Sequence, residues 1–208
     1  MKNTIIIKVW GGLGNQLFQF AFAKSYQLKN NCNVYIDSST GFNNDPYKRE
    51  FVLDQFNISL KESPGLFFKF YKIRFFRIIF KMLKFPNFIN QKIPFKSFRP
   101  HYLKKNHKKI SIFQGYWQSP LYFNNYQNFI KKDLKIKVKI KKNTKFEAKL
   151  IKKNSVALCF RFFQEVKNLN RNNFNDIVYY RNAIKIINKK IKNPEFFIFC
   201  DNNKLAKD

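Results

Sequence analysis

IIIKVWGGLGNQLFQFAFAKSYQLKNNCNVYID, residues 5–37, is the stretch that decides the fold. It begins with a short apolar, β-branched run, which is typical of a buried strand. Glycines follow at positions 11, 12 and 14, and residues 15–29 then carry apolar side chains at helical spacing. A second short strand is expected over residues 33–36. Strand, glycine-rich turn, helix and strand in this order predict an α/β unit that opens a parallel sheet.

The remainder of the chain continues to alternate between helical and strand patterns. The longest pattern, residues 66–85, predicts one amphipathic helix. The other expected segments are an irregular connector over 86–107, strands over 110–113, 135–141, 155–163 and 195–200, and helices over 124–132, 147–154 and 176–192. The strand over 155–163 reads as the most completely buried of these.

The glycine-rich turn lies where phosphate-binding turns lie in nucleotide-binding folds. The dinucleotide fingerprint GxGxxG needs a third glycine where this chain has Leu17, and no GK[ST] follows to make a P-loop. NAD binding through Asp37 is therefore not supported. The turn does offer close backbone approach and two side-chain amides, Asn15 and Gln16, at a helix N-terminus, where hydroxyl or phosphate oxygens bind. By spacing alone, a ligand-binding turn and a plain tight turn both fit.

Arg161 stands inside the apolar run of residues 155–163. A buried guanidinium without an anionic partner costs several kcal/mol. Arginine binds phosphate bidentately, with charge-assisted hydrogen bonds worth roughly 1.5–3 kcal/mol each. The residues alone leave two partners open, a ligand phosphate and a structural carboxylate.

The chain is strongly basic, with 41 Lys and Arg against 12 Asp and Glu and a formal charge of +29. Lys, Phe, Asn and Ile dominate the composition, and all four have codons made only of A and T, so base composition explains part of this charge. Residues 66–85 place aromatic side chains on one arc and six cations on the other. Adsorption to an anionic membrane and packing against the core with solvated cations both fit this pattern.

Several kinds of site find no support in the sequence. The three cysteines include no CxxC pair, which favours free thiols in a reducing cytosol. His101 and His107 have no acidic residue close by, so neither a Ser-His-Asp triad nor an HExxH zinc site is expected. No DxD motif occurs to hold a divalent ion beside a nucleotide.

Residues 11–24, GGLGNQLFQFAFAK, resemble the N-terminal signature of glycosyltransferase family 11, the bacterial and animal α-1,2-fucosyltransferases. Three further segments occur in the family's order. FQGYWQS at 113–119 resembles its mid-chain block, SVALCFR at 155–161 resembles the strand that carries its HxRRGD-type motif, and residues 179–201 resemble its following helix and strand. The resemblance covers nearly the whole chain.

The resemblance implies a GT-B architecture of two Rossmann-like α/β domains. Residues 1–153 would form the N-terminal, acceptor-side domain, and residues 154–208 an incomplete GDP-sugar donor domain. The implied reaction transfers L-fucose from GDP-fucose to a galactose 2-hydroxyl of a bacterial surface glycan, with inversion and without a metal or other cofactor. The implied location is cytoplasmic, with residues 66–85 in peripheral contact with the anionic inner face of the cytoplasmic membrane.

The same resemblance assigns the site residues. Arg161 matches the arginine that pairs with the donor's pyrophosphate, and Asn15 is expected near the fucose or the acceptor hydroxyl. The residues expected to bind the donor are Gly12, Gly14, Gln16 and Arg161. The residues expected to be catalytic are Asn15, Arg161 and Glu165. Glu165 and Asp201 are the two candidates for the base that takes the acceptor's proton.

The chain departs from the family's pattern after the strand. The family's histidine is Cys159 here, its second arginine is Phe162, and its Gly-Asp pair is Phe163-Gln164. The family's serine-rich block is absent, so the chain reads as truncated at the C-terminus. Two alternatives therefore stay open: an inactive truncated remnant of the family, and a basic nucleic-acid-binding protein, although no RNP, KH or zinc signature accompanies the charge.

Overall fold

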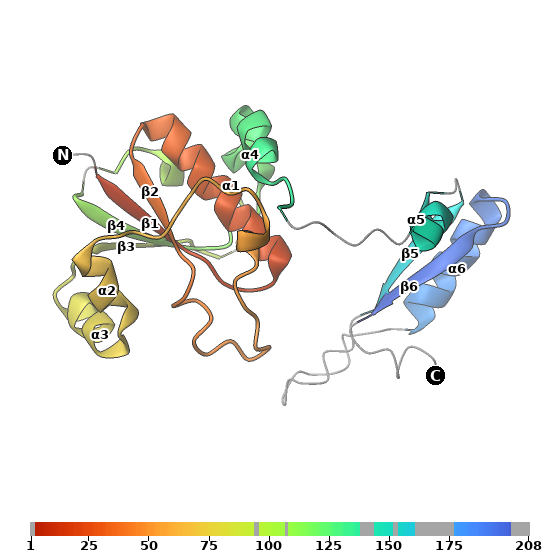
Figure 1. Ribbon diagram of the computed structural model, residues 1–208, viewed down its shortest axis with the longest axis horizontal. Helices are drawn as coiled ribbons and strands as arrows, with labels where there is room; N and C mark the ends of the chain where they lie inside the picture. The colour runs from red at the N-terminus through yellow and green to blue at the C-terminus, as the bar shows by residue number, and fades with distance from the viewer. Residues whose placement is uncertain are drawn as a thin grey trace. The chain divides into compact units, whose positions relative to one another are not determined.

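The structure, a computed structural model, describes residues 3–93, 96–106, 108–137, 144–151, 154–160 and 177–200. The chain divides into two compact units, Met1–Lys139 and Ile140–Asp208. Unit 1 is a three-layer α/β structure, and unit 2 is a small α/β structure with a two-stranded sheet (Figure 1). The predicted α/β class is confirmed.

The sheet of unit 1 has four strands in the order β2-β1-β4-β3. All neighbouring strands run parallel, and Ile7 of the central β1 is paired with Ile36 of β2 and with Phe113 of β4. The strands are β1 (Thr4–Lys8), β2 (Asn33–Asp37), β3 (Asn87–Asn90) and β4 (Ile110–Gln114). The strand, helix and strand predicted from residues 5–37 are all present.

Helices cover this sheet. The α-helices of unit 1 are α1 (Leu13–Asn30), α2 (Leu66–Lys72), α3 (Arg74–Met82) and α4 (Gln127–Asp133). Short 3-10 turns lie at η1 (Leu53–Gln55), η2 (Pro100–Leu103), η3 (Pro120–Tyr122) and η4 (Asn124–Tyr126).

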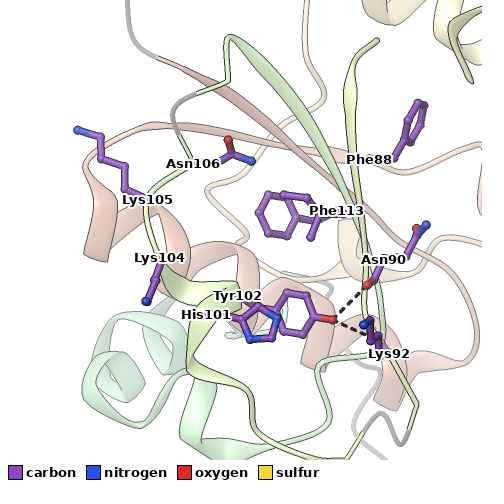
Figure 2. Close-up of a pocket in the computed structure, with 10 residues that line it drawn as sticks. Phe88, Asn90, Lys92, His101, Tyr102, Lys104, Lys105, Asn106 and Phe113 are labelled. Atoms are coloured by element: carbon purple, nitrogen blue, oxygen red, sulfur yellow. Dashed lines mark hydrogen bonds between the residues drawn. The ribbon is translucent and has the colours of Figure 1, made fainter. Parts of the chain in front are cut away.

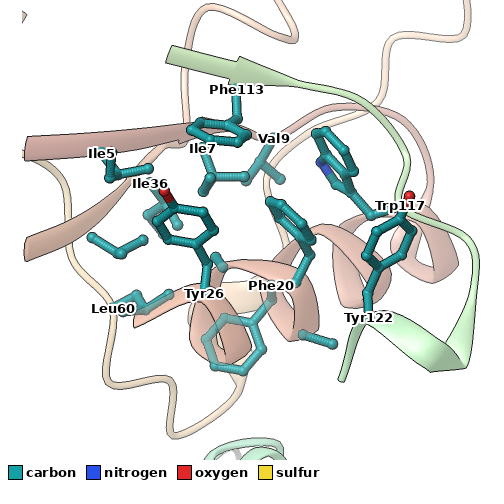
Figure 3. Close-up of a cluster of buried hydrophobic side chains, with 14 of the residues drawn as sticks. Ile5, Ile7, Val9, Phe20, Tyr26, Ile36, Leu60, Phe113, Trp117 and Tyr122 are labelled. Atoms are coloured by element: carbon teal, nitrogen blue, oxygen red, sulfur yellow. The ribbon is translucent and has the colours of Figure 1, made fainter. Parts of the chain in front are cut away.

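The core explains why the helices sit on opposite faces. Side chains alternate along a strand, so Ile5 and Ile7 of β1 face the α1 layer while Ile6 faces the α2 layer. On the α1 side a dense aromatic cluster forms, in which Phe22 stacks on Trp117 at a centroid distance of 4.1 Å. Figure 3 shows this cluster between α1 and the strands. Two apolar faces on β1 require two helical layers.

The predicted helix over 66–85 is two helices. The chain breaks at Ile73, whose extended backbone (φ −82°, ψ 126°) separates α2 from α3. Because of this break, the predicted apolar arc does not form one continuous face. Phe68 and Tyr71 are buried against the sheet, whereas Phe75 is exposed. The buried part agrees with packing against the core, and membrane contact of the exposed part stays a prediction.

Two other predictions for unit 1 need correction. The expected connector over 86–107 contains an edge strand, β3, which four residues with asparagine at both ends do not reveal. Of the strand expected over 135–141, the described part makes one isolated antiparallel bridge, Phe56 to Ile136. Residues 138–141 lie outside the described residues.

Unit 2 pairs β5 (Ser155–Phe160) in parallel with β6 (Glu195–Cys200), and adds α5 (Thr144–Leu150) and α6 (Ile177–Lys190). Helix α5 belongs to this unit, since Phe146 meets the ring of Phe197 at 5.9 Å. The two compact units therefore meet before α5, between residues 139 and 140. The sequence instead predicts a domain boundary between residues 153 and 154, and that boundary stays a prediction. β5 is also less buried than its apolar sequence predicts, with Leu158 buried and Ala157 exposed.

Candidate functional site

The carboxyl ends of β1 and β4 are the place in unit 1 where the fold itself favours a ligand. From β1 the chain passes through α1 to β2 on one side, and it later returns on the other side of β1 through β3 to β4. Ligands of open parallel sheets bind beyond the carboxyl ends of the strands, and β1 and β4 are neighbours in this sheet. The glycine-rich turn follows β1 directly, and the block at 115–119 follows β4.

These two blocks, far apart in the sequence, touch each other. Nε2 of Gln118 donates a hydrogen bond to Oδ1 of Asn15 at 2.8 Å. Beside this pair, the rings of Trp10 and Tyr116 approach to 5.0 Å. The predicted site residue Asn15 is therefore part of one polar and aromatic surface with Gln118, which sequence reasoning did not single out as a site residue.

The glycines of the turn have different structural reasons. Gly11 has φ +81°, the left-handed region that favours glycine. At Gly14 a Cβ would meet nothing within 4 Å, and at Gly12 it would meet only Nε of Arg49 at 3.9 Å. Neither Gly12 nor Gly14 is thus required by packing, which leaves room for a ligand to approach their backbone.

The start of α1 suits an oxygen-rich ligand. Its N-cap residue, Gly12, supplies no side-chain cap, and no acidic residue lies in the first turn. The first N–H groups of a helix carry partial positive charge and attract hydroxyl or phosphate oxygens. The predicted residues Gly12, Gly14 and Asn15 are brought together here.

Hydrogen bonds of the Gln16 side chain hold this turn in place. Its buried side chain donates Nε2 to the carbonyl oxygens of Gly11 at 2.9 Å and Glu50 at 2.8 Å, and its Oε1 accepts from the N–H of Val52 at 3.0 Å. Both N–H groups of the amide are used by the backbone. Gln16 is therefore a positioning residue in this structure, and its contact with the donor stays a prediction.

Arg49, which no motif in the sequence singles out, adds a cation beside the turn. Its guanidinium lies 4.0 Å above the ring of Tyr47 and 3.8 Å from the carboxylate of Asp45. These two contacts hold it close to Gly12. A positive charge near the helix N-terminus strengthens the attraction for an anionic or hydroxyl-rich ligand.

The second block is held rigidly by Gln91, another residue the sequence did not reveal. Oε1 of this buried side chain accepts the N–H groups of Tyr116 at 2.8 Å and Trp117 at 2.9 Å. A Cβ at Gly115 would lie 2.5 Å from Cβ of Gln91, so only glycine fits there. Trp117 is left-handed (φ 53°), a strained state for a bulky residue that concentrates at functional sites. The loop thus presents Gln118 in one fixed orientation.

Asp37, at the end of β2, does not face a ligand. Its buried carboxylate accepts the N–H groups of Ser39 at 3.1 Å and Thr40 at 2.9 Å and also binds the Thr40 hydroxyl. The carboxylate closes its own turn. Nearby, burial lowers the pKa of Lys8, although Asp37 opposes this shift.

The donor-side predictions fall on other parts of the chain. Arg161, Glu165 and Asp201 lie outside the described residues, so their roles stay predictions. Within unit 2, the hydroxyl of Tyr180 donates to the carbonyl oxygen of Cys159 at 2.8 Å. This bond ties α6 to the end of β5, two residues before Arg161 in the sequence.

A second hollow in unit 1 is separate from the two blocks. The described residues that line this open cavity of about 580 Å³ include Lys92, Lys104 and Lys105 and no acidic residue. The hydroxyl of Tyr102 donates to the carbonyl oxygen of Asn90 at 3.1 Å and accepts from the N–H of Lys92 at 3.0 Å (Figure 2). Of the predicted site residues that the structure describes, none lines this cavity.

Comparison with known proteins adds an enzyme class. No family model matches the chain. An α-1,2-colitosyltransferase from Escherichia coli is 26% identical over 211 residues, which cover 96% of this chain and 69% of that protein. The solved structure of the fucosyltransferase NodZ from Bradyrhizobium matches with a TM-score of 0.49 and 13% identity, over 100% of this chain and 75% of that one. The curated relative confirms the predicted similarity to glycosyltransferases and with it the predicted enzyme class.

Proposed function

We propose that this fucosyltransferase-like glycosyltransferase transfers L-fucose from GDP-fucose to the 2-hydroxyl of a galactose unit in a surface glycan. The observation that carries the proposal is the Asn15–Gln118 hydrogen bond. It joins the two blocks that resemble α-1,2-fucosyltransferases at the carboxyl edge of the sheet, where such folds bind ligands.

The acceptor sugar would bind at this pair. Because Oδ1 of Asn15 accepts from Nε2 of Gln118, the pair keeps Nδ2 of Asn15 as a donor and Oε1 of Gln118 as an acceptor. Neither atom bonds another described residue. One donor and one acceptor side by side match a sugar hydroxyl, which both gives and receives a hydrogen bond.

In the proposed reaction, the galactose 2-hydroxyl oxygen attacks C1 of fucose as the bond from C1 to the phosphate oxygen breaks. The bonding electrons leave with GDP, and the hydroxyl proton passes to Glu165 or Asp201 acting as base. The attack comes from the face opposite the leaving group, so the configuration at C1 inverts. Arg161 would stabilise the charge on the departing pyrophosphate without a metal. The sequence resemblance supports these donor-side roles.

The curated relative suggests a second candidate for the donor sugar. That protein is an α-1,2-colitosyltransferase, which supports an α-1,2 linkage here and makes nucleotide-activated colitose the second sugar to try. The proposal also places the protein in the cytoplasm, with residues 66–85 touching the inner face of the membrane.

Calorimetry with GDP and UDP tests the donor half of the proposal. We expect heat with GDP and none with UDP. The Arg161→Gln variant should bind GDP more weakly by on the order of ten- to a hundredfold, the loss of one charge-assisted contact. Arg181→Gln, which removes an exposed arginine of α6, is the matched control and should leave GDP binding unchanged. No heat with GDP at high protein concentration would favour the inactive remnant instead.

A further inference from the structure

Helix α3 exposes an apolar face that no described residue covers. Phe75, Ile78 and Met82 are 65%, 53% and 78% exposed, and their spacing of three and four residues places them on one side of the helix. Leu83, directly after the helix, is also exposed. Large exposed apolar patches are uncommon on monomeric proteins and mark interaction sites.

The opposite side of α3 is fixed to the protein. Phe80 meets the ring of Phe67 at 5.0 Å, and Phe76 meets Phe70 at 4.9 Å. Arg77 donates to the carbonyl oxygen of Lys72 at 2.7 Å, across the break between the two helices. These contacts hold α3 in one orientation and keep its apolar face turned outward.

Cations border this face. Arg74 and Lys81 lie next to it on the helical wheel, and Lys84 follows. No salt bridge to these three is seen within the described part of the chain, whereas Lys72 on α2 pairs with Glu62 at 2.6 Å. No Asp or Glu occurs between Glu62 and Asp133 in the sequence. Arg74, Lys81 and Lys84 therefore add positive charge at the border of this face.

We infer that this face is a membrane-docking surface, in which Phe75, Ile78 and Met82 enter the interface of an anionic bilayer while Arg74, Lys81 and Lys84 bind lipid phosphates. An apolar face bordered by Lys and Arg is what such interfaces bind, and each cation adds about 1 kcal/mol at an anionic surface. A protein partner would need acidic groups opposite these cations, and a second copy of this chain carries only 12 Asp and Glu against 41 Lys and Arg.

The surface differs from the apolar arc that the sequence suggested. Phe68 and Tyr71 are buried in the core beside Ile6 and Ile112, so α2 anchors the helix pair and α3 meets the lipid. No described helix is long and apolar enough to cross a membrane. The inference rests on the proposed membrane contact and not on the proposed reaction, because vesicle binding is measured without any sugar donor.

Co-sedimentation of the full chain with vesicles tests the inference. One vesicle is pure phosphatidylcholine and the other contains 30% phosphatidylglycerol. We expect binding to the second only. The variant R74Q/K81Q/K84Q should bind it more weakly by about fivefold per cation, on the order of a hundredfold in total. The variant F75S/M82S should also lose binding although its charge is unchanged.

A protein of this net charge adheres to any anionic surface, so a control with the same loss of charge decides the result. The variant K131Q/K132Q/K135Q removes three exposed lysines at and after α4 and should retain binding. Phe129→Ser removes an exposed apolar side chain there and should also retain it. Equal losses in the two charge variants, or equal binding to both vesicles, would overturn the inference. So would a change of oligomeric mass in F75S/M82S with vesicle binding intact, since a second copy would then cover the face.

Discussion

At the scale of single residues, two glycines near the turn exist for opposite reasons. A Cβ at Gly41 would lie 2.0 Å from the carbonyl oxygen of Val9, so packing demands glycine there. A Cβ at Gly14 would meet no atom within 4 Å. Packing therefore does not require glycine at position 14, and its role in ligand binding stays a prediction.

Gly14→Ala is accordingly expected to separate stability from binding. Alanine in the first turn of α1 should raise the free energy of unfolding by roughly 0.5–1 kcal/mol, since glycine is a poor helix former. The same methyl group should weaken binding of the acceptor or donor. Urea unfolding and calorimetry measure the two effects. Gly41→Ala is the contrasting variant and should lower stability; unchanged ligand binding in Gly14→Ala would remove this residue from the site.

Gln91 is the residue on which the second block depends. Gln91→Leu leaves the N–H groups of Tyr116 and Trp117 without their acceptor, which costs about 1–3 kcal/mol of unfolding free energy. Gln118 should then lose its fixed position, and transferase activity should fall more than stability explains. Gln127→Leu, at an exposed position on α4, is the control. A wild-type rate in Gln91→Leu would show that the loop's rigidity is not needed.

At the scale of elements, Glu62 links α2 to the end of β2. Its carboxylate accepts from Lys72 of α2 at 2.6 Å and from the hydroxyl of Ser38. Burial acts to raise the pKa of Glu62, but the hydrogen bonds from Lys72 and Ser38 together outweigh it and lower the pKa. These hydrogen bonds connect α2 to the end of strand β2.

This shift fixes the sign of a pH effect. Because the folded pKa lies below the unfolded value of about 4.3, the contribution of Glu62 is present above the unfolded pKa and is lost as the pH falls through the folded one. Glu62→Gln should therefore be less stable than the wild type at neutral pH, with the difference shrinking in acid. Urea unfolding across this range is the measurement; a constant difference down to pH 3 would mean that the carboxylate's charge contributes nothing.

The elements also show what a sequence can predict. The strand, turn and helix over residues 5–37 follow from local periodicity, and the structure has them. A helical wheel does not predict the break at Ile73, because the wheel treats residues 66–85 as one unbroken helix. Strand β3 cannot be predicted from its own residues, because it forms by pairing with β4, which begins 20 residues after β3 ends. The contact of Asn15 with Gln118 joins residues 103 positions apart, and only the parallel order of β1 and β4 brings them together.

At the scale of the whole chain, both hydrophobic clusters found among the described residues lie in unit 1. Both clusters of buried apolar side chains draw all their members from residues 5–134. Cooperative unfolding needs such a core. A fragment of residues 1–139 is therefore expected to fold alone and to unfold in one transition. Its near-ultraviolet circular dichroism should show the signal of an ordered Trp117 packed on Phe22. A fragment without this signal would show that unit 1 needs the rest of the chain.

The measurement that tests the central claim most directly is the product of the reaction. The full chain is incubated with GDP-fucose and a β-galactoside, with and without EDTA, and the linkage is read by NMR. We predict an α-1,2-linked fucosyl product, formed equally with EDTA. Asn15→Ala should slow its formation about a hundredfold or more, and Asn128→Ala, at an exposed position on α4, should not. A folded chain that forms no product from GDP-fucose or activated colitose, or that keeps full activity in Asn15→Ala, would contradict the account.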